Sequence, residues 1–381
     1  MHDFFPGLAG VPAARSKISF IDGQQGILEY RGIPIEQLAE SSTFSETTYL
    51  LLYDRLPSQR ELDQFDTNLR HHRYLRHQLI NLIKCLPKEG HPMDALQAAV
   101  AAIGMFYPTP PAQSSEENYW AAIRLISKLP TIVATFTRLR RGDEPIQPRD
   151  DLAHTANFLY MCSGQVQDAT LSKALDTCLI LHAEHTMNAS TFSGLVTAST
   201  LSDPYTVIAS AIGTLKGRLH GGANEQVIGM LHDIGSAGAA KAYIRAKLEV
   251  RERVMGFGHR IYKVKDPRAT FLQNIAKNLC KRSTESHLYE IAIEVERTMN
   301  EMVGHKAISA NVDFYSGLIY HHIGIETDLY TSVFAIARVA GWLAHCFEQY
   351  KDNRLFRPDQ IYEGKRSRPY VEIRDRTTRA S

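Results

Sequence analysis

The amino-acid sequence predicts an all-α protein. From Pro34 onward, apolar residues recur at the three- to four-residue spacing of one helix face. Signals for helix starts also recur: Ser58 to Glu61 and Ser114 to Glu117 resemble capping boxes, and Pro92 precedes an apolar periodic segment. Few runs alternate apolar and polar residues between turns, as strands do. Helix is therefore expected over well more than half of the chain.

The elements follow in order from these signals. Residues 18–31 alternate loosely around Asp22-Gly23, a pattern typical of a small hairpin. Residues 364–373 break the helical character, and an extended arm with a short strand is expected there. Helical periodicity is clearest in segments 35–53, 94–103, 168–182, 205–215, 225–231, 267–279, 288–303 and 330–347.

Composition narrows the class of protein. A chain of 381 residues, 44% of them hydrophobic, can bury one large core or two unequal ones. Its 43 basic and 41 acidic residues give a net charge of +2, so nothing favours nucleic acid or an anionic membrane as a partner. Five scattered cysteines without a CxxC spacing indicate reduced thiols in a cytoplasmic protein. The best apolar stretch, residues 331–347, is interrupted by Arg338 and His345 and is too short to span a bilayer.

Three irregular joints interrupt the helices, and each combines glycine with an ionisable residue. They are residues 220–224, 256–259 and 311–317. Functional side chains are common on such loops, because a rigid scaffold can position them there. The three joints predict a site assembled between helix ends.

The first joint contains His220, followed by two glycines that let the backbone approach a ligand closely. A helix that opens at Ala223 or Asn224 would place His220 near its positive end, which favours the neutral imidazole. A neutral imidazole can polarise a carbonyl by donating one hydrogen bond. The alternative is a histidine that only stabilises a turn.

The other two joints contain His259 and Asp313. His259 is followed by Lys263 and Arg268, and glycines with nearby cations suit a phosphate- or carboxylate-bearing ligand. Asp313 lies in apolar company, between Val312 and Phe314. Such a carboxylate is either paired structurally or has its basicity raised by desolvation.

Arg338 lies in a helix whose two faces are nearly apolar. A buried guanidinium needs an anionic partner, and this partner is either an internal acid or a substrate carboxylate. His182 and His185 are three residues apart, with Glu184 between them, so both rings would share one helix face. Zinc would need a third ligand, and the sequence has no metallopeptidase motif, so no metal site is expected.

Taken together and in this order, the segments resemble the citrate synthase family. Residues 181–190 are similar to the end of the family's oxaloacetate-side helix, and 220–225 to the segment of its first catalytic histidine. Residues 256–268 match the family's best-known motif, and 311–317 carry its catalytic aspartate. The resemblance extends from Gly7 to Pro358.

The resemblance implies a role for each matching residue. His220 polarises the thioester carbonyl of acetyl-CoA, Asp313 removes a proton from the acetyl methyl group, and His259 hydrogen-bonds to the oxaloacetate carbonyl that is attacked. The implied oxaloacetate-binding residues are His185, Arg268, Arg338 and Arg357, the last from the second subunit. The implied CoA-binding residues are Gly256, Phe257, Gly258, Lys263 and Lys306.

The family also implies two helical domains in a homodimer of the short bacterial type. The large domain is expected at 1–221 and 324–381 and the inserted small domain at 222–323. The implied enzyme is an acyltransferase that condenses acetyl-CoA with oxaloacetate and hydrolyses citryl-CoA. It needs no cofactor, because coenzyme A enters as part of the substrate.

Two other functions compete with this interpretation. A 2-methylcitrate synthase would use propionyl-CoA, but in that subfamily a proline often follows the second histidine, and a threonine stands near Lys263. Here Arg260 and Lys263 favour citrate synthase. A non-catalytic CoA-binding protein on the same fold would be indicated by loss of Asp313 or His220, and both are present.

Overall fold

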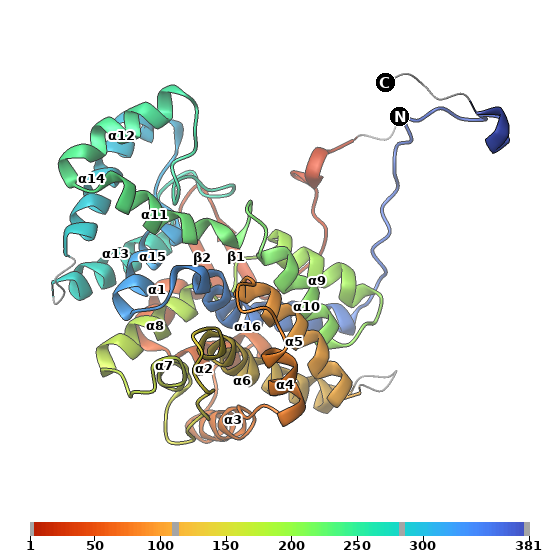
Figure 1. The fold of residues 1–381 in the computed structure, drawn as a ribbon, viewed down its shortest axis with the longest axis horizontal. Helices are drawn as coiled ribbons and strands as arrows, with labels where there is room; N and C mark the ends of the chain where they lie inside the picture. Colours follow the sequence, from red (N-terminus) through yellow and green to blue (C-terminus); the bar gives the residue numbers. More distant parts are fainter. Residues whose placement is uncertain (1–3, 109–113, 282–285, 377–381) are drawn as a thin grey trace.

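The structure, a computed structural model, describes residues 4–108, 114–281 and 286–376. Over these residues it contains sixteen α-helices and one small sheet, which confirms the expected all-α class (Figure 1). The α-helices are α1 (Ile35–Ser41), α2 (Phe44–Tyr53), α3 (Gln59–His71), α4 (His77–Lys84), α5 (Pro92–Phe106), α6 (Ser115–Arg140), α7 (His154–Ser163), α8 (Ala169–His182), α9 (Ala189–Ser199), α10 (Pro204–Leu215), α11 (Asn224–Ile234), α12 (Ala237–Glu249), α13 (Pro267–Cys280), α14 (Ser286–Val303), α15 (Val312–Ile323) and α16 (Tyr330–Lys351).

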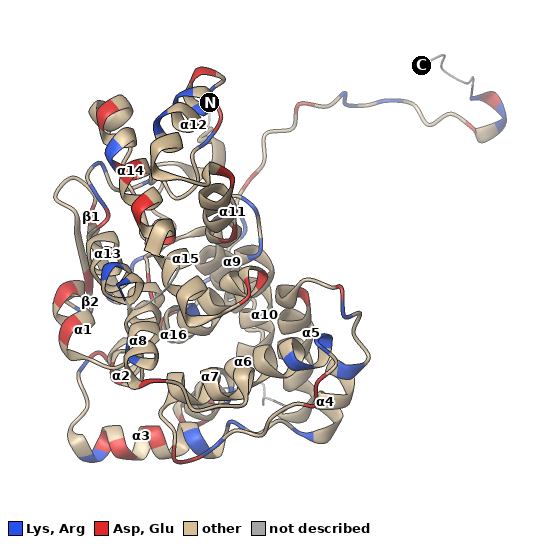
Figure 2. Cartoon of the chain, turned by 60° about the vertical axis from the view of Figure 1, so that its left-hand side comes forward, with Lys and Arg blue, Asp and Glu red and all other residues tan. Residues whose placement is uncertain are grey.

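Local signals set several of these helix starts as expected. Ser58 and Ser114 cap α3 and α6, and each forms a capping box with the glutamate three residues later. Pro92 occupies the first turn of α5, where the missing N–H has no helical partner to lose. Figure 2 shows both signs of charge interspersed along α3, a solvated face.

The N-terminal hairpin is present, with a longer turn than the Asp22-Gly23 signal predicts. Strand β1 (Ser19–Asp22) pairs antiparallel with β2 (Ile27–Tyr30), so four residues, 23–26, form the turn. A third strand that the sequence analysis did not anticipate, β3 (Ile33–Pro34), pairs with β2.

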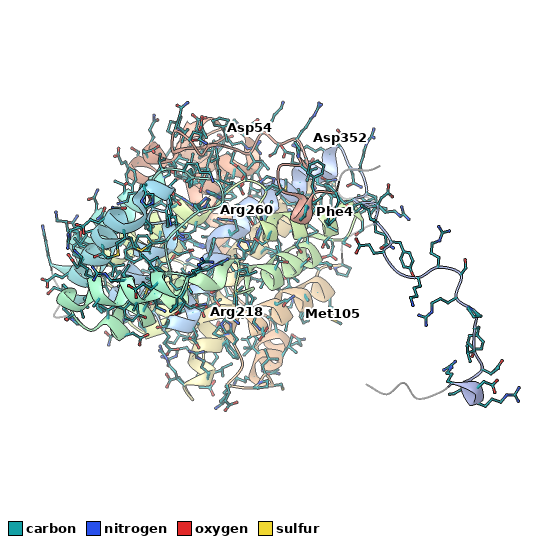
Figure 3. All side chains as sticks on the ribbon, turned by 90° about the horizontal axis from the view of Figure 1, so that it is seen from above. Phe4, Asp54, Met105, Arg218, Arg260 and Asp352 are labelled. Atoms are coloured by element: carbon teal, nitrogen blue, oxygen red, sulfur yellow. The ribbon has the colours of Figure 1, made fainter. Side chains whose placement is uncertain are left out.

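The C-terminal arm is extended, as expected. The prediction of a strand in it is wrong, because residues 364–376, the part of the arm that the structure describes, form none. A short 3₁₀ helix, η5 (Ile373–Asp375), is its one regular element there. The arm leaves the body of the protein (Figures 1 and 2), and its side chains project into solvent (Figure 3). Without a neighbouring strand, its backbone has no partner for a ladder.

Helix α16 forms the centre of the fold. Every residue from Tyr330 to Cys346 is buried, including Arg338 and His345, and α16 packs against α2, α5, α6, α8, α9 and α10. This burial on both faces explains the apolar stretch in the sequence. No helix in the described ranges is long and apolar enough to cross a membrane.

Helices α11 to α15 gather on one side of the molecule, beside α1 and α8 (Figure 1). Within this group α12 packs on α14, and α13 on α15. The group also contacts the rest of the chain, because α13 and α15 both pack on α8 and α11 packs on α16. The candidate residues lie along this junction.

Candidate active site

The second and third joints are fastened to each other by backbone and side-chain hydrogen bonds. The Asn311 backbone N–H donates to the carbonyl of Gly256 (2.9 Å), and its side-chain amide donates to the carbonyl of Gly258 (3.0 Å). Asn311 also caps α15 by accepting the N–H of Asp313 (3.0 Å). One asparagine thus holds the loop that leads to His259 against the helix turn that carries Asp313.

Gly256 is required at this joint. Its φ of +78° lies in the left-handed region, and a Cβ there would lie 2.7 Å from the ring of Phe314. Phe257 packs edge-on against the same ring, at 4.7 Å between centroids. The predicted loop residues Gly256, Phe257 and Gly258 therefore line the start of α15.

Asp313 is not paired structurally. Its Oδ1 atom is buried and has no hydrogen-bond partner among the described residues. Burial raises the pKa of Asp313 from 3.8 to about 6, while the nearby charges of Arg268 and Arg338 limit the rise. Of the two alternatives left open by the sequence, the structure favours a carboxylate with increased basicity.

His259 is held in one tautomer. Its Nδ1 lies 3.0 Å from the backbone N of Ile261 and 3.2 Å from that of Tyr262, so Nδ1 accepts two N–H groups. Burial, followed by the charge of Arg268, lowers the pKa of His259 to about 4. The ring is therefore neutral near pH 7, and its proton is on Nε2, from which it can be donated to a ligand.

His220 is also neutral, with the opposite tautomer. Its Nε2 lies within hydrogen-bond distance of the Ser190 backbone N (3.3 Å), the Ser190 hydroxyl (2.8 Å) and the amide oxygen of Asn188 (3.2 Å). Acceptance of the backbone N–H favours the tautomer with the proton on Nδ1. Burial and the charge of Arg338 lower the pKa of His220 to about 4. The 3₁₀ turn η2 (Gly221–Ala223) follows it, and α11 begins at Asn224, one of the two starts that the sequence suggested.

His185 lies beside His259, with 5.1 Å between ring centroids. It is buried, and its Nε2 is 3.3 Å from the hydroxyl of Tyr262. Burial and the charge of Arg268 hold the pKa of His185 well below its ordinary value. The structure thus brings together two histidines that are far apart in the sequence.

Arg268 is not a free cation. Its Nε and Nη2 donate to the two carboxylate oxygens of Asp266, at 2.9 and 2.7 Å, and both side chains are buried. Although burial opposes it, Asp266 holds the pKa of Arg268 above its ordinary value. Asp266 fixes the guanidinium in the plane of a bidentate pair and leaves Nη1 with a single long bond, 3.4 Å to the carbonyl of Leu181.

Arg338 has no such partner. Its Nε donates to the carbonyl of His182 (2.7 Å), and its guanidinium lies 4.8 Å from the ring centre of Phe334. No carboxylate of the described residues is within ion-pair distance of it, and burial lowers its pKa to about 10. The buried carboxylate of Glu184 acts on Arg338 through its charge but forms no ion pair with it, so the guanidinium keeps room for a ligand carboxylate.

Three predicted residues are not brought to this site within the chain. Arg357 lies beyond the end of α16 and is exposed. Lys263 and Lys306 are exposed as well, on the loop after His259 and at the end of the 3₁₀ turn η3 (Gly304–Lys306). Cations on exposed loops suit a phosphate ligand outside the buried centre.

His182 and His185, the pair considered for zinc, do not share a helix face as the sequence predicted. Helix α8 ends at His182, so His185 lies past the helix and the two rings share no helix face. Within the parts of the chain that the structure describes, no group of three or more His, Cys, Asp or Glu is arranged to hold a metal ion.

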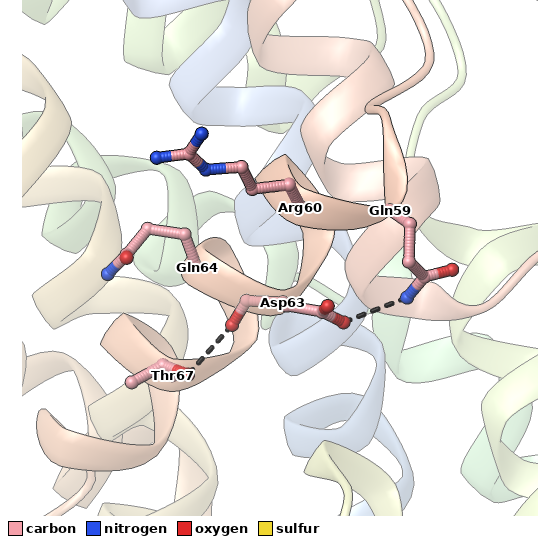
Figure 4. A pocket seen from close by; sticks show the side chains of 5 residues that line it. All are labelled: Gln59, Arg60, Asp63, Gln64 and Thr67. Carbon is pink, nitrogen blue, oxygen red and sulfur yellow. Dashed lines mark hydrogen bonds between the residues drawn. The ribbon is translucent and has the colours of Figure 1, made fainter.

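A surface hollow of about 510 Å³ lies elsewhere, on the outer face of α3. Its side chains belong to one exposed helix, and two hydrogen bonds, from Gln59 and Thr67 to Asp63, stay within that helix (Figure 4). It holds none of the residues discussed above, and we assign it no part in the site.

Sequence reasoning gave no role to Ser190, Tyr262 or Asp266. Ser190 sets the tautomer of His220, Tyr262 contacts His185, and Asp266 orients Arg268. Asp266 carried the clearest signal, because an aspartate before Pro267 is a typical helix cap, and it does cap α13. Ser190 and Tyr262 carried no comparable signal.

Comparisons with known proteins agree on one family. Residues 7–359 match the family model described as "Citrate synthase, C-terminal domain". The chain is 52% identical to a citrate synthase of Synechocystis sp., covering 98% of this chain and 94% of that protein, and 51% identical to one of Acidithiobacillus ferridurans, covering 98% and 99%.

Solved structures give the same result. A citrate synthase from Pyrobaculum aerophilum superposes with a TM-score of 0.92 at 40% identity, covering 98% of this chain and 95% of that one. The citrate synthase of Thermoplasma acidophilum, solved as a ternary complex with carboxymethyl coenzyme A and oxaloacetate, superposes with a TM-score of 0.94 at 33% identity, covering 99% of this chain and 100% of that one.

Proposed function

Because the chain belongs to the citrate synthase family and is an acyltransferase of the citrate (Si)-synthase type, we propose that it condenses acetyl-CoA with oxaloacetate through His220, Asp313 and His259. The product of the condensation is citryl-CoA, and its hydrolysis gives citrate and CoA. The protein's own residues carry the chemistry as follows.

Asp313 is the base that takes a proton from the acetyl methyl group. A methyl beside a thioester is a very weak acid, so the negative charge that develops on the thioester oxygen has to be stabilised at the same time. The Nδ1–H of neutral His220 supplies that hydrogen bond. A raised pKa of about 6 makes Asp313 a stronger base than an ordinary aspartate while leaving it ionised at pH 7.

His259 acts on the second substrate. Its Nε2–H donates to the 2-oxo carbonyl of oxaloacetate and draws electron density from the carbon that the enol attacks. Arg338 binds one oxaloacetate carboxylate, since its guanidinium has no carboxylate of its own. Arg268 offers Nη1 to the other, and His185 lies on the same side as His259.

The carbon–carbon bond forms between the acetyl methyl carbon and the carbonyl carbon of oxaloacetate. The carbonyl oxygen becomes an alkoxide that the Nε2–H of His259 stabilises, and it takes up one proton in place of the one that Asp313 removed from the methyl group, so that Asp313 and His259 both return to their starting protonation states. Water then attacks the citryl thioester carbonyl, the carbon–sulfur bond breaks, and CoA leaves as a thiol. Each step needs a site that excludes bulk water, which the burial of His185, Arg268 and Arg338 provides on the oxaloacetate side.

The observation that carries this proposal is the buried, unpartnered Oδ1 of Asp313. The charges of Arg268 and Arg338 act on this carboxylate, and the same two arginines act on His259 and His220 respectively. A structural carboxylate with a buried oxygen would have a donor at that oxygen. Release of CoA from acetyl-CoA plus oxaloacetate, followed with a thiol reagent, tests the proposal. We expect activity in the wild type and losses of about a hundredfold to ten-thousandfold in His220→Ala and His259→Ala. Full activity in either variant would remove that histidine from the mechanism.

The finer points of assembly are part of the same proposal. We infer a homodimer in which Arg357 of one chain reaches the oxaloacetate carboxylate in the other, because Arg357 is exposed beyond the end of α16 in its own chain. Gly256 to Gly258 would border the CoA adenine, with Lys263 and Lys306 at its phosphates.

The small domain would comprise residues 222–323 and the large domain 1–221 and 324–381. All five cysteines are free thiols, as expected for a cytoplasmic enzyme.

A further inference from the structure

The N-terminal hairpin contacts the two segments that carry His185 and His259, the histidines proposed for the oxaloacetate side. Its base is attached to the end of α8. The Tyr30 hydroxyl donates to the carbonyl of Glu184 (2.8 Å), and the Ser19 hydroxyl donates to the Glu184 carboxylate (2.9 Å). The Ser19 oxygen also accepts the backbone N–H of Thr186 (3.2 Å). These bonds fix the residues on either side of His185.

The tip of the hairpin rests on the loop that follows His259. The backbone N–H of Lys263 donates to the carbonyl of Gly23 (2.8 Å). The approach is so close that a Cβ on Gly23 would lie 2.3 Å from the carbonyl oxygen of Ile261. The turn itself is stiffened by Asp22, whose Oδ1 accepts the N–H groups of Gln24 (2.8 Å) and Gln25 (3.0 Å).

The contact at Ile261 leads directly to the catalytic ring. His259 Nδ1 accepts the backbone N–H groups of Ile261 and Tyr262, and these two bonds set its tautomer and its direction. Tyr262 in turn lies against His185. Any movement of the Ile261 peptide therefore changes where His259 points and how far it lies from His185.

We propose that the hairpin turn, residues 23–26, is a positioning element for oxaloacetate binding, with Gly23 as its critical residue. The hairpin is a spacer between the segment of His185 and the loop of His259, and it sets the distance between the two rings. Gly23 makes this possible because only a residue without a Cβ lets the turn approach the Ile261 carbonyl. This inference rests on the proposed role of His259.

The test is Gly23→Ala. The φ of Gly23 is not in the left-handed region, so alanine adds a contact without backbone strain. An ordinary Cβ contact begins at 3.4 Å, and the added atom would lie at 2.3 Å, so the His259 loop has to move by about 1 Å. A displacement of that size at a reacting group can lower a rate about a hundredfold. We expect kcat/KM for oxaloacetate to fall about tenfold to a hundredfold, with a raised KM.

The KM separates positioning from simple damage to the fold. A partly unfolded preparation has fewer working sites, which lowers kcat but leaves the KM for oxaloacetate unchanged. Gly238→Ala, in α12 with nothing within 4 Å of the added Cβ, is the matched control, and its kinetics should equal those of the wild type. Asp22→Ala, which loosens the same turn without adding a contact, should raise the KM in the same direction by a smaller factor.

A wild-type KM in both Gly23→Ala and Asp22→Ala overturns the inference. If Gly23→Ala yields too little folded protein, Asp22→Ala alone decides it by the same criterion. The assignment of His259 fails separately, because His259→Ala would then keep its activity whatever the hairpin variants do.

Discussion

The burial of Asp313 predicts opposite effects of one substitution on activity and on stability. Asp313→Asn keeps the size and shape of the side chain and removes the base. We expect turnover to fall about a hundredfold to ten-thousandfold, as is typical when a general base is lost. The same substitution should make the protein more resistant to unfolding at neutral pH, because the folded state no longer has to hold a buried charge.

The magnitude follows from the pKa. Folding raises the pKa of Asp313 from 3.8 to about 6, so the folded protein binds this proton more tightly than the unfolded chain. The charge therefore costs nothing below pH 3.8, costs progressively more between pH 3.8 and 6, and costs its full amount above pH 6. At about 1.4 kcal/mol for each pKa unit, the full amount is about 3 kcal/mol.

The assay is thermal unfolding at two pH values. An unfolding entropy of about 2.1 cal/mol/K per residue gives about 0.8 kcal/mol/K for the whole chain, so 3 kcal/mol corresponds to a rise in Tm of about 4 °C. Asp313→Asn should show this rise at pH 8 and a smaller one near pH 5. Asp233→Asn, which removes an exposed carboxylate from α11, is the matched control and should show neither.

Wild-type kinetics complete the test, because only the ionised carboxylate is a base. Below pH 6, kcat/KM for acetyl-CoA should fall by about a factor of ten for each pH unit as Asp313 becomes protonated. Near-normal turnover of Asp313→Asn, or an unchanged Tm at pH 8, would refute the reasoning that a buried, unpaired carboxylate is the base.

Three further predictions concern the substrates and the assembly. Propionyl-CoA differs from acetyl-CoA by one methylene, which a close-fitting pocket can discriminate by about 1–3 kcal/mol, so methylcitrate should form with a kcat/KM about ten to two hundred times lower; an equal or higher value would assign the enzyme as a 2-methylcitrate synthase. Arg338→Met should raise the KM for oxaloacetate about tenfold to a hundredfold, the worth of a charge-assisted hydrogen bond, and an unchanged KM would remove Arg338 from the binding site. Mixed dimers of Arg357→Ala and His220→Ala chains should regain part of the activity that each parent lacks, because one of their two sites is intact, and proven mixed dimers that stay inactive would contradict an exchange of Arg357 between subunits.

The sequence was sufficient wherever the determining interaction is local. The starts of α3 and α6 follow from capping boxes, and the helical class follows from periodicity over hundreds of residues. The strand expected in the C-terminal arm failed because a strand requires a partner, and no signal within the segment says whether one is near. The third strand, β3, was missed for the same reason, since two residues give no period.

In the candidate site too, the sequence predicted what depends on local residues and missed what depends on long-range packing. The motifs pointed to His220, His259 and Asp313, whose chemistry depends on residue type. The pairing of Arg268 with Asp266 was also local, yet it changes Arg268 from a free cation into a fixed one, and only geometry decides that. Whether Arg338 had an internal partner depended on packing between α8 and α16, residues more than 150 positions apart, and was left open until the structure answered it.

The contacts of the hairpin also constrain the order in which parts of the chain can fold during synthesis. Tyr30 bonds to residues about 150 positions later in the chain, so at 5–20 residues per second the strand waits about 8–30 s for the α8 segment to be made, and longer for the loop that meets Gly23. An isolated two-stranded hairpin is at best marginally stable in water. The hairpin thus leaves the ribosome long before the two segments that it contacts, and it is among the last elements to reach its final position. A nascent chain that ends between His259 and Lys263 would carry His185 and His259 but would lack the hydrogen bond from Lys263 to Gly23 that holds the His259 loop against the hairpin.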